Sequence, residues 1–167
     1  MASLLELAQS IEGTRIGVAI AESSLAFPII EGIHLIGLSI SVGLIFLTDL
    51  RLLGVFLRHV PLNDVLHHLR PYVLGGFAAI FISGGLLFWA EAATLVASPP
   101  FPFKLAFIVL GGLNALYFEF VIARQPAVQN AQHGALPANA QLAGLASLVL
   151  WTLVIVCGRL IPYIPAW

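Results

Sequence analysis

Four long apolar runs dominate the chain, and short polar or proline-rich stretches separate them. Each run approaches the roughly 20 apolar residues that a helix needs to cross a bilayer. Helices are expected because lipid offers no hydrogen-bond partners to backbone groups. We place the spans at Leu25–Leu47, Tyr72–Ala92, Phe103–Ile122 and Leu142–Ile161. Short connections between them predict an all-α, up-and-down bundle of four transmembrane helices over residues 25–167.

A different pattern precedes the first span. In residues 1–24, apolar positions recur at roughly helical spacing against polar ones, with Leu4, Leu5 and Ala8 as examples. This pattern is typical of an amphipathic helix that lies on a membrane surface. The alternative is a solvent-exposed leader. A cleaved signal peptide is not expected, because acidic residues precede the first basic residue, Arg15.

Composition supports a membrane protein. Of 167 residues, 60% are hydrophobic and 9% are charged, and the mean hydropathy is +1.02. Soluble domains are about 25% charged. The net charge of -1 offers no basic surface for nucleic acid. The expected partners are the lipid bilayer and either a second copy of the chain or a larger membrane complex.

The distribution of arginine predicts the orientation. Arg51, Arg58 and Arg70 flank the first connection, and Arg124 follows the third span. Basic residues favour the cytoplasmic side. We therefore expect a multi-pass protein with both termini on the outer side of the membrane, opposite the cytoplasm.

Charged and polar side chains interrupt the spans in two layers. Charge at membrane depth is costly and often marks a functional site. The span limits sort these residues into an outer layer (Glu31, His34, Trp89, Glu91, Lys104, Arg159 and Tyr163) and an inner layer (Asp49, Arg51, His67, His68, Arg70, Glu119 and Arg124).

The outer layer contains a Glu-x-x-His motif, Glu31 and His34, whose side chains share one helix face. Helical bundles present metal ligands with this spacing, and Glu91 lies at a similar depth. The motif indicates a transition metal, haem or quinone site. No second such motif exists, and His34 lacks a histidine at its own depth for bis-histidine haem. A haem would need another ligand or a second copy of the chain.

The alternative for the outer layer is an electrostatic cluster. In it Glu31 and Glu91 pair with Lys104 and Arg159, and His34 is hydrogen-bonded. Together with these two basic residues, Trp89 and Asn114 form the predicted supporting polar layer.

The inner layer is simpler. Asp49, Arg51, Arg70 and Arg124 are expected to be anchors whose side chains reach the cytoplasmic face. Glu119 is either paired with Arg124 on its own helix or acts as a proton-relay carboxylate. Uncharged polar residues at mid-membrane depth are expected to bond between helices. These are Ser39, Ser41, Ser83, Asn114 and Thr152.

Two motifs carry a resemblance. The chain reads Glu31-Gly-Ile-His34-Leu-Ile-Gly37-Leu and then Asp49-Leu-Arg51-Leu-Leu-Gly54. This pattern resembles a family of uncharacterised bacterial inner-membrane proteins, and the resemblance covers nearly the whole chain. It implies four membrane helices after an amphipathic segment, without an established activity. A histidine early in the first helix is more distantly similar to copper-resistance and cytochrome b561-like proteins.

These residues and the resemblance leave three alternative functions. The first is a metal- or redox-associated membrane protein using Glu31, His34 and Glu91. The second is a non-enzymatic membrane subunit or assembly factor. The third is a small proton-coupled transporter with His34 and Glu119 on its path. No nucleophile–base pair or phosphate loop stands out, so a non-enzymatic protein is favoured.

Overall fold

The computed structural model describes residues 2–129 and 136–164, which contain helices and no strand. Four helices are long and apolar enough to cross a membrane. They are α3 (Ala26–Leu52), α4 (Leu62–Ala90), α6 (Pro100–Tyr117) with the π-helical turn η1 (Phe118–Ile122), and α8 (Ala138–Leu160). The shorter helices are α1 (Ala2–Glu12), α2 (Arg15–Ala21), α5 (Ala92–Ala97) and α7 (Pro126–Gln129). The predicted all-α, four-span architecture is confirmed, and the chain is an integral membrane protein.

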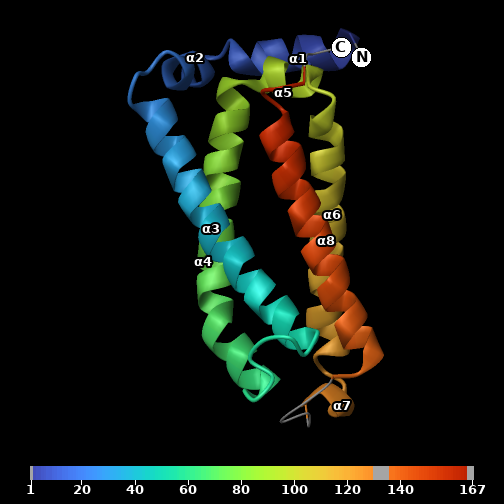
Figure 1. Ribbon diagram of the computed structural model, residues 1–167. Coiled ribbons are helices and arrows are strands. Elements are labelled where there is room, and N and C mark those ends of the chain that lie inside the picture. Colours follow the sequence, from blue (N-terminus) through green and yellow to red (C-terminus); the bar gives the residue numbers. More distant parts are fainter. Residues whose placement is uncertain (1, 130–135, 165–167) are drawn as a thin grey trace.

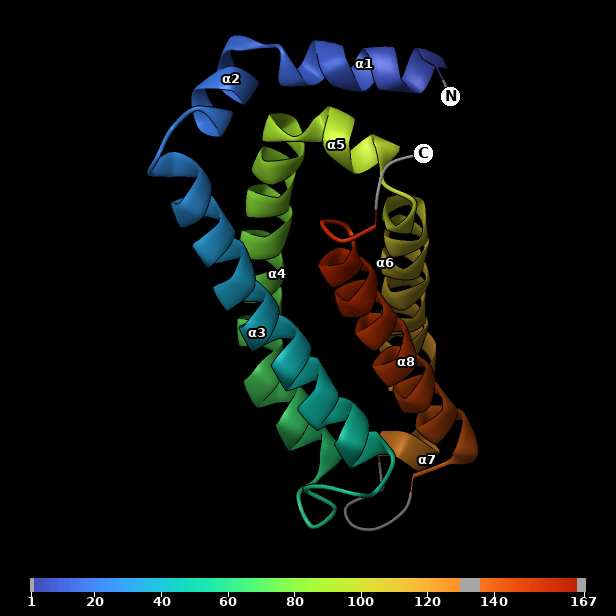
Figure 2. The same ribbon diagram turned by 45° about the horizontal axis from the view of Figure 1, so that its top comes forward.

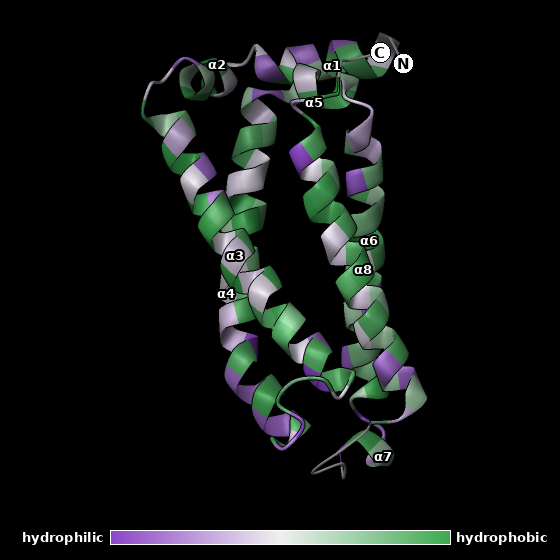
Figure 3. Cartoon of the chain, in the orientation of Figure 1, coloured by the Kyte–Doolittle hydropathy of each residue, from purple (hydrophilic) through white to green (hydrophobic). Residues whose placement is uncertain are grey.

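The spans form two helical hairpins. Helix α3 packs along α4, α6 packs along α8, and α3 also contacts α8 (Figure 1). Helices α1, α2 and α5 cover one end of the bundle, the α1 end (Figure 2). Helix α7 and the α3–α4 connection lie at the opposite end, the α7 end. Hydrophobic positions run along the spans, and hydrophilic ones gather towards the helix ends (Figure 3).

The second span begins earlier than expected. Helix α4 starts at Leu62 rather than Tyr72, and Pro71 lies inside the helix. Asp64 sits in the first turn, where the helix dipole favours an acid. With 29 residues, α4 is about 43 Å long. A hydrocarbon core is about 30 Å thick, so the polar first turns extend to headgroup level.

The N-terminal segment folds as two helices where the apolar pattern suggested one. Thr14 separates them, and its hydroxyl oxygen accepts a hydrogen bond from the Gly17 amide at 3.3 Å, which caps α2. The same hydroxyl accepts from the Trp89 indole at 2.7 Å. Glu12 accepts from the Ala93 amide at 2.9 Å. The segment is thereby joined to the end of α4 and to the start of α5.

The α3–α4 hairpin depends on close backbone contact. A Cβ atom at Gly76 would lie 3.0 Å from the Gly37 carbonyl oxygen and would clash with the Ser41 hydroxyl. The Ser41 side chain is fully buried and donates a 2.9 Å hydrogen bond to the Val73 carbonyl. Beside this contact, the buried side chains of Val42 and Trp151 belong to the mid-bundle core.

A glycine-to-alanine pair tests this contact. Gly76→Ala should lower the free energy of unfolding by about 1–3 kcal/mol, because the added methyl group overpacks the interface. At Gly75 nothing lies within 4 Å of an added Cβ. Gly75→Ala should therefore be neutral or stabilising by up to about 1 kcal/mol. Reversible unfolding in mixed detergent micelles measures both, and equal losses for the two variants would contradict the packing argument.

Candidate functional site

His34 is held between the first two spans near the α1 end. Its Nδ1 atom lies 3.0 Å from the Ser83 hydroxyl oxygen. That hydroxyl donates its own hydrogen to the Ala79 carbonyl at 2.5 Å. With the serine proton directed at Ala79, the matching tautomer of His34 is the one in which Nδ1–H donates to Ser83. In that tautomer the Nε2 atom of a neutral His34 is unprotonated and can act as a base or as a ligand.

Gly84 and Lys104 are two further neighbours of the His34 imidazole. A Cβ at Gly84 would lie 3.1 Å from His34 Cε1, so the ring packs directly on the α4 backbone. Lys104 of α6 is near enough to interact with His34 electrostatically. Its ammonium group also lies close to Gly158 of α8, where an added Cβ would be 3.3 Å away. The α1 end thus combines a base on one hairpin with a cation on the other.

The remaining outer-layer residues are arranged differently from either expectation. Glu31 and Glu91 are exposed. Arg159 donates to the Tyr163 hydroxyl at 3.1 Å and also lies over that ring. Over residues 2–129 and 136–164, the ion pair is Arg70–Glu119, so the expected pairs with Lys104 and Arg159 are not formed.

A metal-ligand set is not assembled at the Glu-x-x-His motif. In the described part of the chain, no three histidine, cysteine, aspartate or glutamate side chains are grouped to hold a metal ion. Glu31, His34 and Glu91 share the α1 end without converging. A protein-only metal centre at these residues therefore has no geometric support here.

The uncharged polar residues divide into two groups. Ser41 and Ser83 bond across the α3–α4 interface, and Asn114 donates to the Ala143 carbonyl across α6–α8 at 3.0 Å. For Ser39 and Thr152 the prediction was wrong. Their hydroxyls donate to carbonyls four residues earlier in their own helices, because both side chains face away from the neighbouring spans.

Asp49 and Arg51 are buried inside the protein, although we expected surface anchors. Their exposed fractions are 4% and 0%. The Arg51 Nε atom donates to the Val60 carbonyl at 2.8 Å and so holds the α3–α4 connection against α3. The Asp49 carboxylate faces Ser147 of α8. Both residues fix the junction of α3 with its neighbours.

A polar pocket of about 430 Å³ opens at the α7 end. Arg70 of α4 forms an ion pair there with Glu119 of η1, so Glu119 does not pair with Arg124 as one expectation had it. The turn η1 is π-helical, with the Ala123 amide bonded to the Phe118 carbonyl at 2.8 Å. Such turns are rare in proteins as a whole, but those that occur are often at functional sites.

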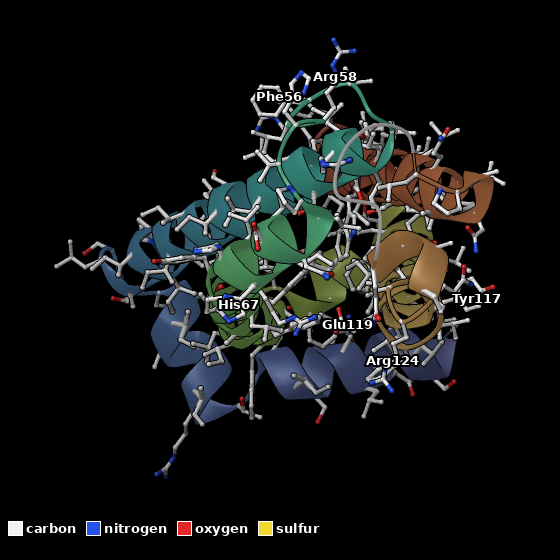
Figure 4. The ribbon with its side chains drawn as sticks, turned by 90° about the horizontal axis from the view of Figure 1, so that it is seen from below. Phe56, Arg58, His67, Tyr117, Glu119 and Arg124 are labelled. Atoms are coloured by element: carbon white, nitrogen blue, oxygen red, sulfur yellow. The ribbon has the colours of Figure 1, made fainter. Side chains whose placement is uncertain are left out.

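The wide turn brings both Glu119 and Arg124 to the pocket wall. Residues five apart do not share a face in an α-helix, so a regular helix would separate them. Arg124 lies over the Phe120 ring, 5.2 Å from its centroid. His67 of α4 lines the same pocket, and Figure 4 shows these side chains at the α7 end. Arg58 lies apart from them on the α3–α4 connection.

Sequence reasoning missed the partner of His34 and the α7-end pocket. Ser83 and His34 lie at the same depth by counting from the span limits, which is a signal that was available. The pocket had no such signal, because it depends on the π-helical turn and on the rotation of α4.

The α1 end carries a group of acids, Glu12 of α1, Glu31 of α3 and Glu91 at the end of α4. Although the residue as a whole is exposed, desolvation of its carboxyl group by neighbouring atoms raises the pKa of Glu91, and the nearby carboxylates of Glu12 and Glu31 raise it further. A carboxyl group whose pKa is higher in the folded than in the unfolded protein stabilises the fold when it is protonated. That stabilisation is complete at low pH and is lost as the pH rises through the elevated pKa.

Replacing this carboxyl group should change the pH profile. Glu91→Gln should remove part of the loss of stability that follows as the pH rises above about 4.3, the ordinary glutamate pKa, since the amide cannot ionise. Thermal unfolding of the detergent-solubilised protein measures the profile. Glu22→Gln, at an exposed residue at the end of α2, is the control. Superimposable pH profiles for wild type and Glu91→Gln would contradict the assignment.

Comparison with known proteins gives one match. No curated protein and no solved structure is significantly similar to the chain. Residues 15–164 match DUF6644, a family of unknown function. The matched range includes all four spans, His34 and the residues of the α7-end pocket. The chain belongs to the DUF6644 family.

Proposed function

We propose that the protein is a redox-associated membrane protein that binds the headgroup of a quinone-type carrier at His34. The observation that carries this proposal is the fixed imidazole. Ser83 accepts from Nδ1–H, which holds the ring and leaves Nε2 as an acceptor. A quinol hydroxyl can donate to that nitrogen, and histidine is suited to take up the proton near neutral pH.

Lys104 supplies the complementary charge. An ammonium group within electrostatic range of His34 can donate a hydrogen bond to a ligand carbonyl. The described residues offer Lys104 no ion-pair partner within 4 Å. Placing a charged side chain inside a membrane costs free energy, so such residues are rare and usually mark a ligand site or a transport pathway. A quinol, whose hydroxyl groups can donate to a base and accept from a cation, fits this pair of side chains better than a metal ion does.

Haem and a transition metal remain the other candidates for the same histidine. In the described part of the chain, His34 belongs to no group of three histidine, cysteine, aspartate or glutamate side chains that could hold a metal ion. A metal or haem at His34 would therefore need ligands from outside such a group, for example from a second copy of the chain. The absorption spectrum and the metal content of the purified protein therefore distinguish haem and a transition metal from a quinone.

The decisive experiment compares histidine variants of the purified protein. Solvent extraction and titration with a short-chain quinol, kept reduced, should show a bound carrier. His34→Ala should weaken its binding at least about tenfold, which corresponds to 1.4 kcal/mol. His59→Ala, in the exposed α3–α4 connection, should leave binding unchanged. A Soret band or stoichiometric metal lost in His34→Ala would replace the quinone with that cofactor.

A glycine pair gives a control that leaves His34 in place. Gly84→Ala puts a methyl group 3.1 Å from the imidazole and should weaken quinone binding by displacing the ring. Gly85→Ala meets nothing within 4 Å and should bind as wild type does. If both variants and His34→Ala bind normally, or if the wild type binds no ligand, a non-enzymatic membrane subunit or assembly factor becomes the better proposal.

A further inference from the structure

The α7-end pocket has charged walls of both signs that lie apart from the His34 site. Arg70 and Arg124 contribute two guanidinium groups, and Glu119 and Asp64 contribute two carboxylates. The formal charge of these four side chains is balanced. A pocket of about 430 Å³ is large enough for a small ligand, since ligand pockets begin at roughly 300 Å³.

Both arginines can engage an anion. Arg124 lies over the Phe120 ring and lines the pocket, and no carboxylate lies within 4 Å of it among the described residues. Arg70 is paired with Glu119, but the side chains are 51% and 38% exposed. Exposed ion pairs contribute only about 0–1 kcal/mol to stability, so a ligand can replace this one at little cost.

The chemistry of that replacement restricts the ligand. An anion alone would take Arg70 from Glu119 and leave the carboxylate unpaired. A ligand with an anion and an ammonium group restores both interactions, because its anion binds Arg70 and its ammonium binds Glu119. Two guanidinium groups from different elements suit a phosphate, which has several acceptor oxygens.

The position of the pocket fits a group found at membrane surfaces. His67 and Arg70 belong to the first turns of α4, which extend beyond the hydrocarbon core. Pro71 has no N–H group, so it cannot donate to the His67 carbonyl four residues earlier.

We propose that the α7-end pocket binds a zwitterion with a phosphate and a primary ammonium group, the chemistry of phosphoethanolamine. The phosphate lies between Arg70 and Arg124, and the ammonium group binds Glu119 and Asp64. The source is either the headgroup of an ethanolamine phospholipid or a free small molecule. This site is independent of the function proposed at His34.

The test uses the full chain in nanodiscs of phosphatidylglycerol, titrated calorimetrically with phosphoethanolamine. Glycerol 3-phosphate, which lacks the ammonium group, should bind at least about tenfold more weakly. Arg124→Gln should weaken phosphoethanolamine binding by a similar factor without breaking the Arg70–Glu119 pair. Arg58→Gln, at the same end but outside the pocket, should have no effect.

A change of selectivity distinguishes a ligand contact from a structural defect. Glu119→Gln removes the ammonium partner and frees Arg70, so it should reverse the preference and favour glycerol 3-phosphate. An unfolded or distorted pocket would lose both ligands together. If the preference is unchanged in Glu119→Gln, or if Arg58→Gln is as harmful as Arg124→Gln, the proposal is wrong.

A second arm identifies the source of the zwitterion. Native mass spectrometry of protein from mixed-lipid nanodiscs should show retention of phosphatidylethanolamine over phosphatidylglycerol if the headgroup is the ligand, with the preference lost in Arg124→Gln. Saturable binding of soluble phosphoethanolamine without lipid preference identifies a free molecule. Failure of both arms overturns the proposal and leaves the His34 proposal untouched.

Discussion

Close contact between the backbones of α3 and α4 is the constraint on which the α1-end site depends. Between membrane helices lipid removes the hydrophobic drive for association, so steric fit and hydrogen bonds must hold the helices together. Gly37 and Gly76 allow the approach, and Ser41 bonds across it to Val73. The His34–Ser83 contact lies on the same interface. The functional side chain is therefore positioned by the same packing that forms the hairpin.

The second hairpin and its junction with the first follow the same principle. An added Cβ at Gly111 would lie 3.3 Å from Trp151, and one at Gly144 would lie 3.0 Å from Leu52. Gly111 thus leaves room for the Trp151 ring between α6 and α8, and Gly144 allows α8 to pack closely against α3. The two candidate sites differ in what they need from this scaffold. His34 needs one interface, whereas the α7-end pocket needs α4 and η1 to be placed correctly relative to each other.

Much of the fold was predictable because span number depends on the length of apolar runs. Helix ends were less predictable, since α4 continues through polar residues and past Pro71. Side-chain partners depend on helix rotation, which a single sequence does not reveal. For this reason the sequence did not reveal that Glu119 pairs with Arg70 of another helix instead of Arg124. Likewise, Arg51 has the charge of an anchor, and only the packing of the α3–α4 connection over it explains its burial.

The attachment of the N-terminal segment has a consequence for biogenesis. Thr14 and Trp89 are 75 residues apart, and Glu12 and the Ala93 amide are 81 apart. A ribosome adds residues from the N-terminus, so α1 emerges long before its partners exist. The N-terminal segment cannot form these contacts until α3 and α4 have been inserted and α5 has been synthesised. Its docking therefore requires a complete α3–α4 hairpin, so closure of this end of the bundle is a late step of folding.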